Sequence, residues 1–118
     1  MRDLKSDIID WLETLTPDHL GAILRVEVRK TSPNFEFIQD LLAVGCPINA
    51  VDQDGQTALH IAANILNLDV MEFLISVGAD VNARNYIGDT ASDTYDRAIR
   101  LRKNIAKARE LVKKRKGS

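Results

Sequence analysis

A 33-residue self-similarity limits what this chain can fold into more than any other feature of its sequence. When the chain is shifted by 33 residues against itself, glycines, asparagines, alanines and apolar residues coincide without a gap. The coinciding pairs are Leu41 with Leu74, Leu42 with Ile75, Gly45 with Gly78, Ile48 with Val81, Asn49 with Asn82, Ala50 with Ala83, Gly55 with Gly88, Thr57 with Thr90 and Ala58 with Ala91. A fixed period of this length indicates a stack of repeats, in which each unit buries its apolar face against its neighbours.

Each unit is predicted to contain two helices and a turn. Asp54-Gly55 is a turn pair, and the hydroxyl of Thr57 is placed to cap a helix that runs from Ala58 to about Leu66. A second helix is expected from Leu68-Asp69 to a C′ glycine at Gly78. The helical periodicity predicts that the buried residues are Leu59, Ala62 and Ala63 in the first helix and Val70, Phe73 and Leu74 in the second.

Residues 52–83, DQDGQTALHIAANILNLDVMEFLISVGADVNA, resemble one complete ankyrin repeat. The likeness lies in Asp, Gly, Thr, Leu-His, Ala-Ala and Gly-Ala-Asp-Val-Asn-Ala at fixed spacings without an insertion. Residues 35–51 resemble the second half of a preceding repeat, and residues 85–91 open another. The resemblance implies an all-α fold, an ankyrin-repeat solenoid of stacked helix-turn-helix units with short hairpin loops.

The sequence departs from the family pattern at four places. Ala58 replaces the proline that follows the capping threonine, and Cys46-Pro47 replaces Ala-Asp in a loop; both changes are expected to be tolerated. Leu66 stands where the family has a left-handed glycine, at a cost of roughly 1 kcal/mol unless Asn67 adopts the positive φ instead. In the last unit a polar set replaces the usual apolar core, as expected of a terminal cap; its members are Ser92, Asp93, Thr94 and Tyr95.

The two ends are predicted to be helices that close the stack. Apolar residues at helical spacing indicate helices over 4–14, from Pro17 to about Lys30, over 35–44, and one or two helices over 90–114. We expect one domain over 1–118, divided into an N-terminal helical cap (1–33), a partial repeat (34–51), a full repeat (52–84), a C-terminal capping repeat (85–114) and a basic tail (115–118).

Charge is distributed very unevenly along the chain. The formal net charge is -1, yet residues 1–96 hold 16 acidic and 6 basic residues, whereas residues 97–118 hold 1 acidic and 10 basic residues. The basic residues alternate with Ile105, Ala108 and Leu111, which predicts an amphipathic capping helix with only its last few residues free. The N-terminus has no uninterrupted apolar run, so neither a signal peptide nor a membrane span is expected.

No group of residues has the spacing of a catalytic or metal site. His60 has no nucleophile or carboxylate converging on it, and the resemblance implies a structural hydrogen-bonding role between repeats. Cys46 lies in a neutral stretch and is interpreted as a small buried substitute for alanine. The turn aspartates lack the spacing of a calcium loop. We therefore expect no enzyme, no cofactor and no metal, and a chain located inside the cell, in the cytoplasm or the nucleus.

The resemblance implies a protein-binding surface made of the loop tips and the exposed side of the first helix of each repeat. It implies that the partner-binding residues are Val51, Gln53, Asp54, Gln56, Asn64, Ile65, Arg84, Tyr86, Ile87 and Asp89. Apolar residues at positions that stacking does not need, surrounded by polar ones, are typical of an interface. The chain is accordingly interpreted as a monomeric module that binds another protein or a peptide without catalysing a reaction.

The basic C-terminus is a second candidate site. Its most concentrated part is the run Lys113, Lys114, Arg115 and Lys116, which also resembles a nuclear-import signal. Such a helix suits contact with nucleic acid, an acidic membrane or an acidic protein, and it equally suits a solvated helix whose cations complement its own dipole. The alternative function is therefore a nucleic-acid-associated or nuclear regulatory factor that uses this helix.

Overall fold

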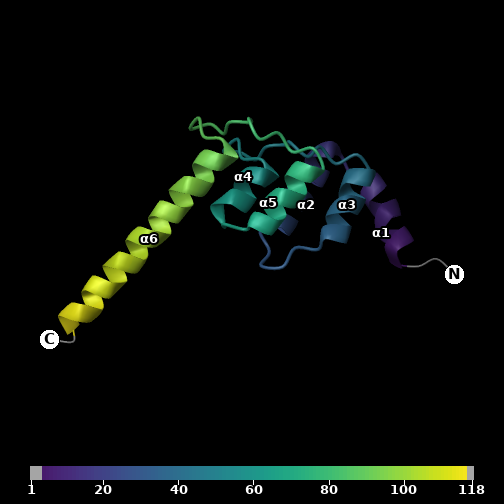
Figure 1. The fold of residues 1–118 in the computed structure, drawn as a ribbon. Coiled ribbons are helices and arrows are strands. Elements are labelled where there is room, and N and C mark those ends of the chain that lie inside the picture. Colours follow the sequence, from purple (N-terminus) through teal and green to yellow (C-terminus); the bar gives the residue numbers. More distant parts are fainter. Residues whose placement is uncertain (1–3, 117–118) are drawn as a thin grey trace.

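The computed structural model describes residues 4–116, and within that range every regular element is a helix (Figure 1). The helices are α1 (Leu4–Glu13), α2 (Pro17–Val28), α3 (Phe35–Ala43), α4 (Ala58–Asn64), α5 (Leu68–Ser76) and α6 (Ala91–Lys116). The all-helical architecture expected from the repeat is confirmed.

The helices stack in two rows. The first row is α2, α4 and α6, because α4 packs against both of the others. The second row is α1, α3 and α5: α1 packs against α3, and the ring of Phe35 in α3 stacks on that of Phe73 in α5 with the centroids 4.8 Å apart. Across the rows, α2 pairs with α3 and α4 pairs with α5. The chain thus advances along the stack by one two-helix unit at a time.

Polar side chains cap the helices where the turns deliver the chain to them. In four helices the N-cap side chain accepts a hydrogen bond from the backbone N–H three residues later, which satisfies a donor that the helix itself leaves unpaired. These N-caps are Thr16 of α2, Asn34 of α3, Thr57 of α4 and Asn67 of α5. At the other end of α5, Gly78 has φ +107° and acts as the predicted C′ glycine.

Small apolar residues allow the rows to pack closely. Ala62 and Ala63 of α4 are fully buried and Leu59 is nearly so, which confirms the predicted stripe. Val70 and Leu74 of α5 are buried as predicted, and Phe73 is half-buried. Since alanine places little bulk between helix axes, α4 can lie between α2, α5 and α6 as the centre of the core.

The turn between α4 and α5 places Leu66 itself in the left-handed conformation, with φ +61°. Asn67 cannot take over that role, because it has φ -94° and caps α5 by accepting a hydrogen bond from the N–H of Val70. Leu66 therefore retains the strain that the sequence predicts for a side chain at this position.

Four helices end slightly earlier than the periodicity predicts. α1 ends at Glu13 instead of residue 14, and α3 ends at Ala43 instead of Val44. α2 ends at Val28 instead of Lys30, and α4 ends at Asn64 instead of Leu66. The residues that follow tighten into turns, in which the N–H of Leu66 donates to the carbonyl of Ala63.

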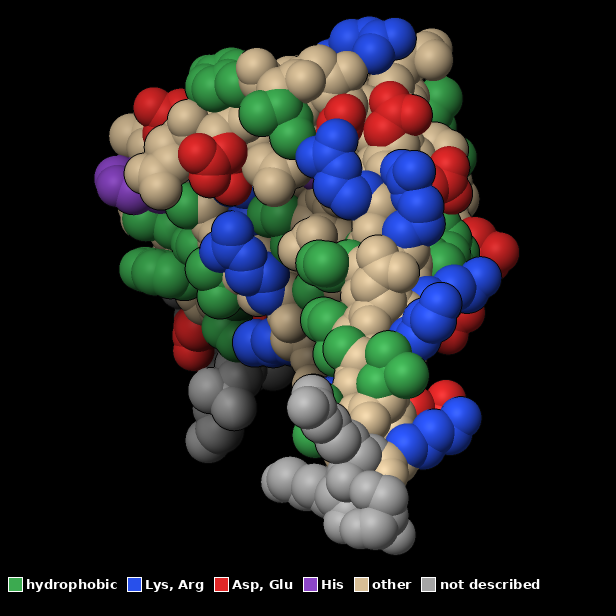
Figure 2. Space-filling view, turned by 90° about the vertical axis from the view of Figure 1, so that its left-hand side faces the viewer, with side chains coloured by type: hydrophobic (Ala, Val, Ile, Leu, Met, Phe, Trp, Pro, Cys, Tyr) green, Lys and Arg blue, Asp and Glu red, His purple; other side chains and the backbone are tan. Residues whose placement is uncertain are grey.

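The prediction that only the last few residues of the basic helix are free is wrong. α6 is one straight helix, and every side chain from Leu101 to Lys114 is exposed; we call residues 101–114 the arm (Figures 1 and 2). The arm gives the molecule a radius of gyration of 17.8 Å, against about 13.5 Å for a compact domain of this length. The arm contains no glycine or proline and is rich in strong helix formers, so nothing local ends the helix at the edge of the stack.

A candidate protein-binding surface at the loop tips

The loop before α4 forms a closed tip around Asp52. Its Oδ1 accepts hydrogen bonds from the N–H of Asp54 at 2.8 Å and from the N–H of Gln56 at 3.0 Å. The N–H of Asp52 donates in turn to the carbonyl of Gln56 at 3.0 Å. Gly55 completes the turn with φ +75°. One carboxylate therefore holds the whole tip in a single shape.

The loop before α6 repeats this arrangement 33 residues later, with Asn85 in the place of Asp52. Oδ1 of Asn85 accepts from the N–H of Ile87 at 3.2 Å and from the N–H of Asp89 at 2.9 Å, and its own N–H donates to the carbonyl of Asp89 at 2.9 Å. The two tips differ in charge: Asp52 also lies 3.8 Å from a guanidinium nitrogen of Arg29, whereas Asn85 is a neutral amide.

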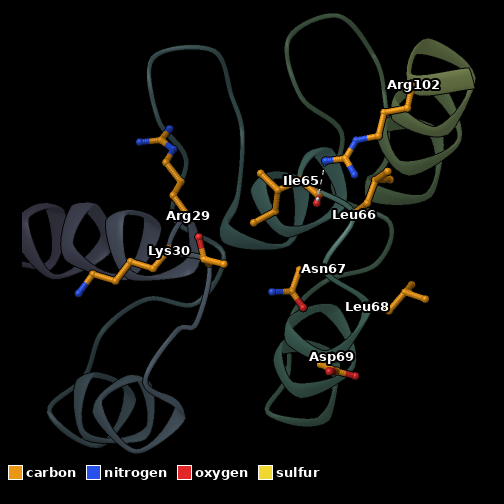
Figure 3. A pocket seen from close by; sticks show the side chains of 9 residues that line it. Arg29, Lys30, Ile65, Leu66, Asn67, Leu68, Asp69 and Arg102 are labelled. Atoms are coloured by element: carbon orange, nitrogen blue, oxygen red, sulfur yellow. Dashed lines mark hydrogen bonds between the residues drawn. The ribbon is translucent and has the colours of Figure 1, made fainter. Parts of the chain in front are cut away.

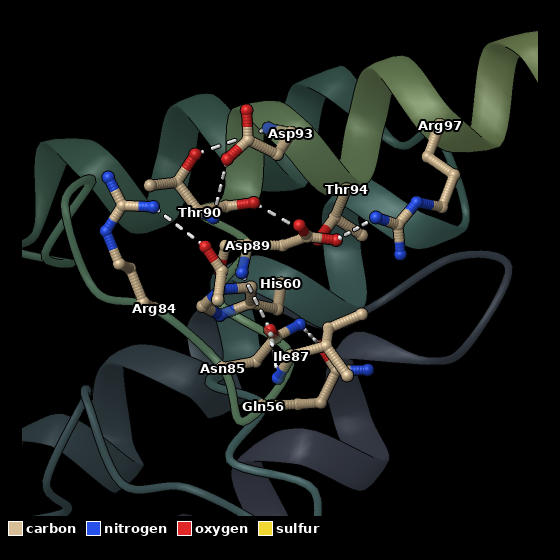
Figure 4. A network of polar contacts seen from close by, with 11 residues as sticks. Gln56, His60, Arg84, Asn85, Ile87, Asp89, Thr90, Asp93, Thr94 and Arg97 are labelled. Carbon is tan, nitrogen blue, oxygen red and sulfur yellow. Dashed lines mark hydrogen bonds and ion pairs between the residues drawn. The ribbon is translucent and has the colours of Figure 1, made fainter.

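Three contacts join the two tips into one surface. The amide Nδ2 of Asn85 donates to Oε1 of Gln56 at 3.2 Å (Figure 4), and the N–H of Tyr86 donates to the carbonyl of Asp54 at 3.2 Å. The ring of Tyr86 lies on the backbone of Gly55, where any Cβ would lie only 2.5 Å from the ring. The backbone of the first tip therefore holds Tyr86 at two points, its N–H and its ring.

His60 supports this surface from within the stack. Its Nδ1 accepts the N–H of Thr57 at 3.2 Å, so the ring proton is on Nε2, which donates to the carbonyl of Asp89 at 2.8 Å (Figure 4). The hydroxyl oxygen of Thr57 in turn accepts a hydrogen bond from the backbone N–H of His60. The ring is 1% exposed. The structural hydrogen-bonding role predicted for His60 is confirmed, and both of its nitrogens are occupied by this role.

Asp93 performs the same capping function in the last unit, where the family pattern has a histidine. Its carboxylate accepts the N–H of Thr90 at 3.1 Å, and its own N–H donates to the hydroxyl of Thr90. The hydrogen bond from the backbone of Thr90 lowers the pKa of Asp93, and the hydroxyl of Thr90 acts in the same direction. Arg97 of α6 adds an ion pair to Asp89 at 2.8 Å.

A depression of about 480 Å³ lies between α2 and the first loop tip. The loop contributes Val51, Gln53 and Asp54, all of which belong to the predicted partner-binding set. The helix contributes Ala22, Arg25, Val26 and Arg29. Two exposed valines, Val26 and Val51, therefore lie beside two arginines and an acidic loop in this depression.

A second depression of about 580 Å³ lies on the other side of Arg29, which lines both. Arg29 and Lys30 lie on one side of it at the end of α2, and Arg102 of α6 lies on the other, donating to the carbonyl of Ile65 at 3.5 Å (Figure 3). The turn from Ile65 to Asp69, between α4 and α5, lines the depression between these two sides. Three cations outnumber the single acidic residue of the lining, Asp69, which favours a partner segment that carries negative charge.

The predicted partner-binding residues differ in how accessible they are. The exposed members are Val51, Gln53, Asp54, Asn64, Arg84, Tyr86 and Ile87. Gln56, Ile65 and Asp89 are half-buried; the side chains of Gln56 and Asp89 make the internal contacts described above. Arg84 donates to the carbonyl of Gly88 at 2.7 Å and so reinforces the second tip.

The sequence-based prediction omitted the residues that α2 and α6 bring to the surface, namely Arg25, Val26, Arg29, Lys30 and Arg102. A signal for one of them is present in the sequence. Val26 lies off the apolar stripe of α2, which is formed by Leu20, Leu24 and Val28, and it is accordingly exposed.

Cys46, the acidic turn residues and the basic run were the other candidates considered for a site. Burial raises the pKa of the Cys46 thiol to about 11, with Arg25 acting weakly in the opposite direction, and the side chain is buried as predicted. Among the described residues no group of three or more His, Cys, Asp or Glu side chains is placed to hold a metal ion. Lys113 and Lys114 are exposed on the arm, whereas the side chains of Arg115 and Lys116 lie outside the described residues.

None of the helices in the described range is both long enough and apolar enough to cross a membrane.

Comparison with known proteins agrees with the geometry of the stack. The family model "Ankyrin repeat" matches residues 54–86. The chain is 38% identical over 85 residues to protein phosphatase 1 regulatory subunit 27 of Mus musculus, and equally to that of Homo sapiens, which covers 72% of this chain and 53% of each relative. It is 41% identical over 56 residues to the neurogenic locus Notch protein of Drosophila melanogaster, covering 47% of this chain and 2% of that protein.

The chain therefore matches about half the length of the phosphatase regulatory subunits. The matched family model spans the second half of one loop tip, the α4–α5 pair and the start of the next tip, which is one complete unit of the stack. Two successive tips with the same hydrogen bonds, helix pairs in two rows and the matched repeat together make this chain an ankyrin-repeat protein.

Proposed function

We propose that this protein is a non-catalytic module that binds another protein or a peptide through its loop tips and the adjoining side of α2. The observation that carries the proposal is the placement of Tyr86 and Ile87, which are 73% and 69% exposed on a tip held rigid by hydrogen bonds. A large aromatic residue displayed on a fixed backbone loses little entropy when a partner covers it, which is what interface anchors require.

The surroundings of these residues support the same function. Val51 and Val26 are also exposed, and charged residues of both signs border them. An apolar centre with a polar rim is the usual composition of a protein interface. Both depressions are shallow hollows on the surface that share Arg29 in their linings, so an extended segment that crosses Arg29 fits them better than an enclosed small molecule.

The relatives supply one specific candidate partner. Two of them bear the name protein phosphatase 1 regulatory subunit 27, and the segment they share with this chain contains the complete repeat. We propose protein phosphatase 1 as the first partner to be tested. The cationic depression beside Arg29 and Lys30 favours an acidic segment on whatever partner binds there.

The test is a binding measurement on the full chain with matched variants. Peptides selected from a displayed proteome library, and purified protein phosphatase 1, are titrated into the wild type, into Tyr86→Ala and into Gln39→Ala. Gln39 is exposed on α3, in the other row of helices. We expect Tyr86→Ala to weaken binding about tenfold or more, and Gln39→Ala to leave it unchanged. Binders that tolerate Tyr86→Ala would contradict the proposed surface, and a phosphatase that does not bind would exclude only that partner.

A further inference from the structure

The last helix of the first row, α6, has no partner in the second row. In the second row α3 packs against α1 and Phe73 of α5 stacks on Phe35 of α3, but within residues 4–116 no further helix of that row follows α5. The chain that would form the next member continues instead as the straight arm of α6 (Figure 1). The uncovered side of α5 and the arm are therefore two surfaces that the same repeat leaves without a partner.

The uncovered side of α5 is an apolar groove. It has a volume of about 160 Å³. The groove is lined by Leu59, Leu68, Met71, Ile75, Val81, Ala91, Ser92 and Tyr95. Leu68 is 53% exposed and Ile75 is 45% exposed, whereas Val70 and Leu74 on the other side of the same helix are buried in the core. Large aliphatic side chains gathered at one groove indicate a surface that a further element covers.

The arm carries a matching apolar stripe. Along α6 the residues Ala91, Thr94 and Ala98 are buried against the stack, and the same face continues outward, at alternating steps of three and four residues, as Leu101, Ile105, Ala108 and Val112. Ile105 is 45% exposed and Val112 is 54% exposed. Figure 2 views the arm obliquely from the side of its tip and shows hydrophobic side chains next to lysines and arginines. A narrow stripe with this spacing is the pattern that packs against another helix.

The two surfaces are complementary in charge. Glu72 of α5 directly follows the groove residue Met71, and neither α5 nor the lining of the groove contains a basic residue, whereas the arm carries six lysines and arginines and one acidic residue, Glu110. Two arms packed against each other would instead bring cations together, because Arg102 and Arg109 follow Leu101 and Ala108 directly and so flank the stripe. The charges therefore favour α5 over a second arm as the surface that the stripe contacts.

We propose that the protein forms a dimer in which the arm of each copy packs in the α5 groove of the other. The arm cannot reach the groove of its own chain, because α6 is one continuous helix that points away from the stack (Figure 1). A reciprocal exchange of the two arms buries both stripes and both grooves and closes the assembly at two copies. This dimer replaces the monomer expected from the sequence.

The first test measures the oligomeric state of the full chain by sedimentation equilibrium. The wild type is expected to be a dimer whose dissociation constant rises with salt, since opposite charges border the contact. Ile105→Asp is expected to raise that constant about tenfold or more. Ala106→Asp is the matched control, because it adds the same charge to the adjacent exposed residue, which lies off the stripe. A monomeric wild type would overturn the proposal, including one whose arm binds only nucleic acid or anionic vesicles.

The second test distinguishes an arm in the groove from an arm on an arm. Ile75→Asp alters the groove and leaves the arm intact, with Ser76→Asp as its neighbouring control. We expect Ile75→Asp to weaken the dimer as much as Ile105→Asp does, and an equimolar mixture of these two variants to associate more tightly than either alone, because one native contact is restored. If Ile75→Asp dimerises like the wild type, the groove is not the contact. Tyr86→Ala is expected to leave dimerisation unchanged, which separates this proposal from the proposed function.

Discussion

The ring of Tyr86 lies against the backbone of Gly55, so close that a Cβ atom on residue 55 would be 2.5 Å from Cδ1 of the tyrosine. Gly55 also has φ +75°, which side chains other than hydrogen resist. One glycine therefore serves two requirements. It closes the first loop tip, and it provides the surface on which the most exposed aromatic residue of the second tip is supported.

Gly55→Ala is expected to lower the free energy of unfolding by about 2–3 kcal/mol, because it adds a steric clash to the strain of positive φ. Gly45→Ala is the control: Gly45 has φ +97° and nothing within 4 Å of an added Cβ, so its cost is the strain alone, about 1 kcal/mol. Urea denaturation measures both. In a Tyr86→Ala background the two costs should become equal, and a difference that persists there would show that the tyrosine is not its cause.

His60→Ala is expected to cost about 2–3 kcal/mol in unfolding free energy, because it removes two buried hydrogen bonds and leaves a cavity. The loss should appear in hydrogen exchange as faster exchange of the N–H of Asn85, which donates to the carbonyl of Asp89, the group that Nε2 of His60 contacts. His19 also lies at the third position of a capped helix but is exposed. His19→Ala should change stability by less than about 0.5 kcal/mol, and equal losses at the two sites would contradict a link between repeats.

Leu66→Gly is expected to increase the unfolding free energy by about 0.5–1 kcal/mol, because glycine adopts φ +61° without strain. The gain is reduced by the lost apolar contact of a half-buried side chain and by the greater freedom of glycine in the unfolded chain. Thermal denaturation followed by circular dichroism measures it. Asn67→Gly is the opposite case, since it removes the cap of α5 and should destabilise the protein. A destabilised Leu66→Gly would show that the leucine contributes more by packing than it costs in strain.

Cys46 predicts a loss of stability at alkaline pH. The pKa of its thiol is raised from the ordinary value of 9.0 to about 11 in the folded protein, so the unfolded chain loses the proton first. The contribution is fully present below pH 9 and is lost as the pH rises toward 11, by about 3 kcal/mol at most. The wild type should therefore lose more stability over this range than Cys46→Ala. Parallel pH profiles for the two proteins would contradict the raised pKa, as would rapid alkylation of the native thiol at pH 8.

The elements that a few adjacent residues determine were predictable. A threonine or asparagine before an apolar run caps a helix wherever it occurs, and a glycine after the run ends it, so the bounds of α5 and the cap at Thr57 follow from local chemistry. The shared shape of the two loop tips follows from the 33-residue repeat, which places Asn85 in the position of Asp52. Even the capping by Asp93 is a local property, although it departs from the family pattern.

The arm and the borders of the candidate surface were decided by tertiary structure. Residues 99–114 form an amphipathic helix whether they fold back or continue, because the periodicity is the same in both cases, and only packing against α4 shows where the stack stops covering it. Arg29 and Arg102 are 73 positions apart in the sequence and meet at one depression because α2 and α6 belong to the same row. The repeat, its caps and its turns therefore follow from the sequence alone, since they depend on neighbouring residues. Which apolar faces are covered, and which charges share a surface, depends on contacts between distant segments that only the stacked structure brings together.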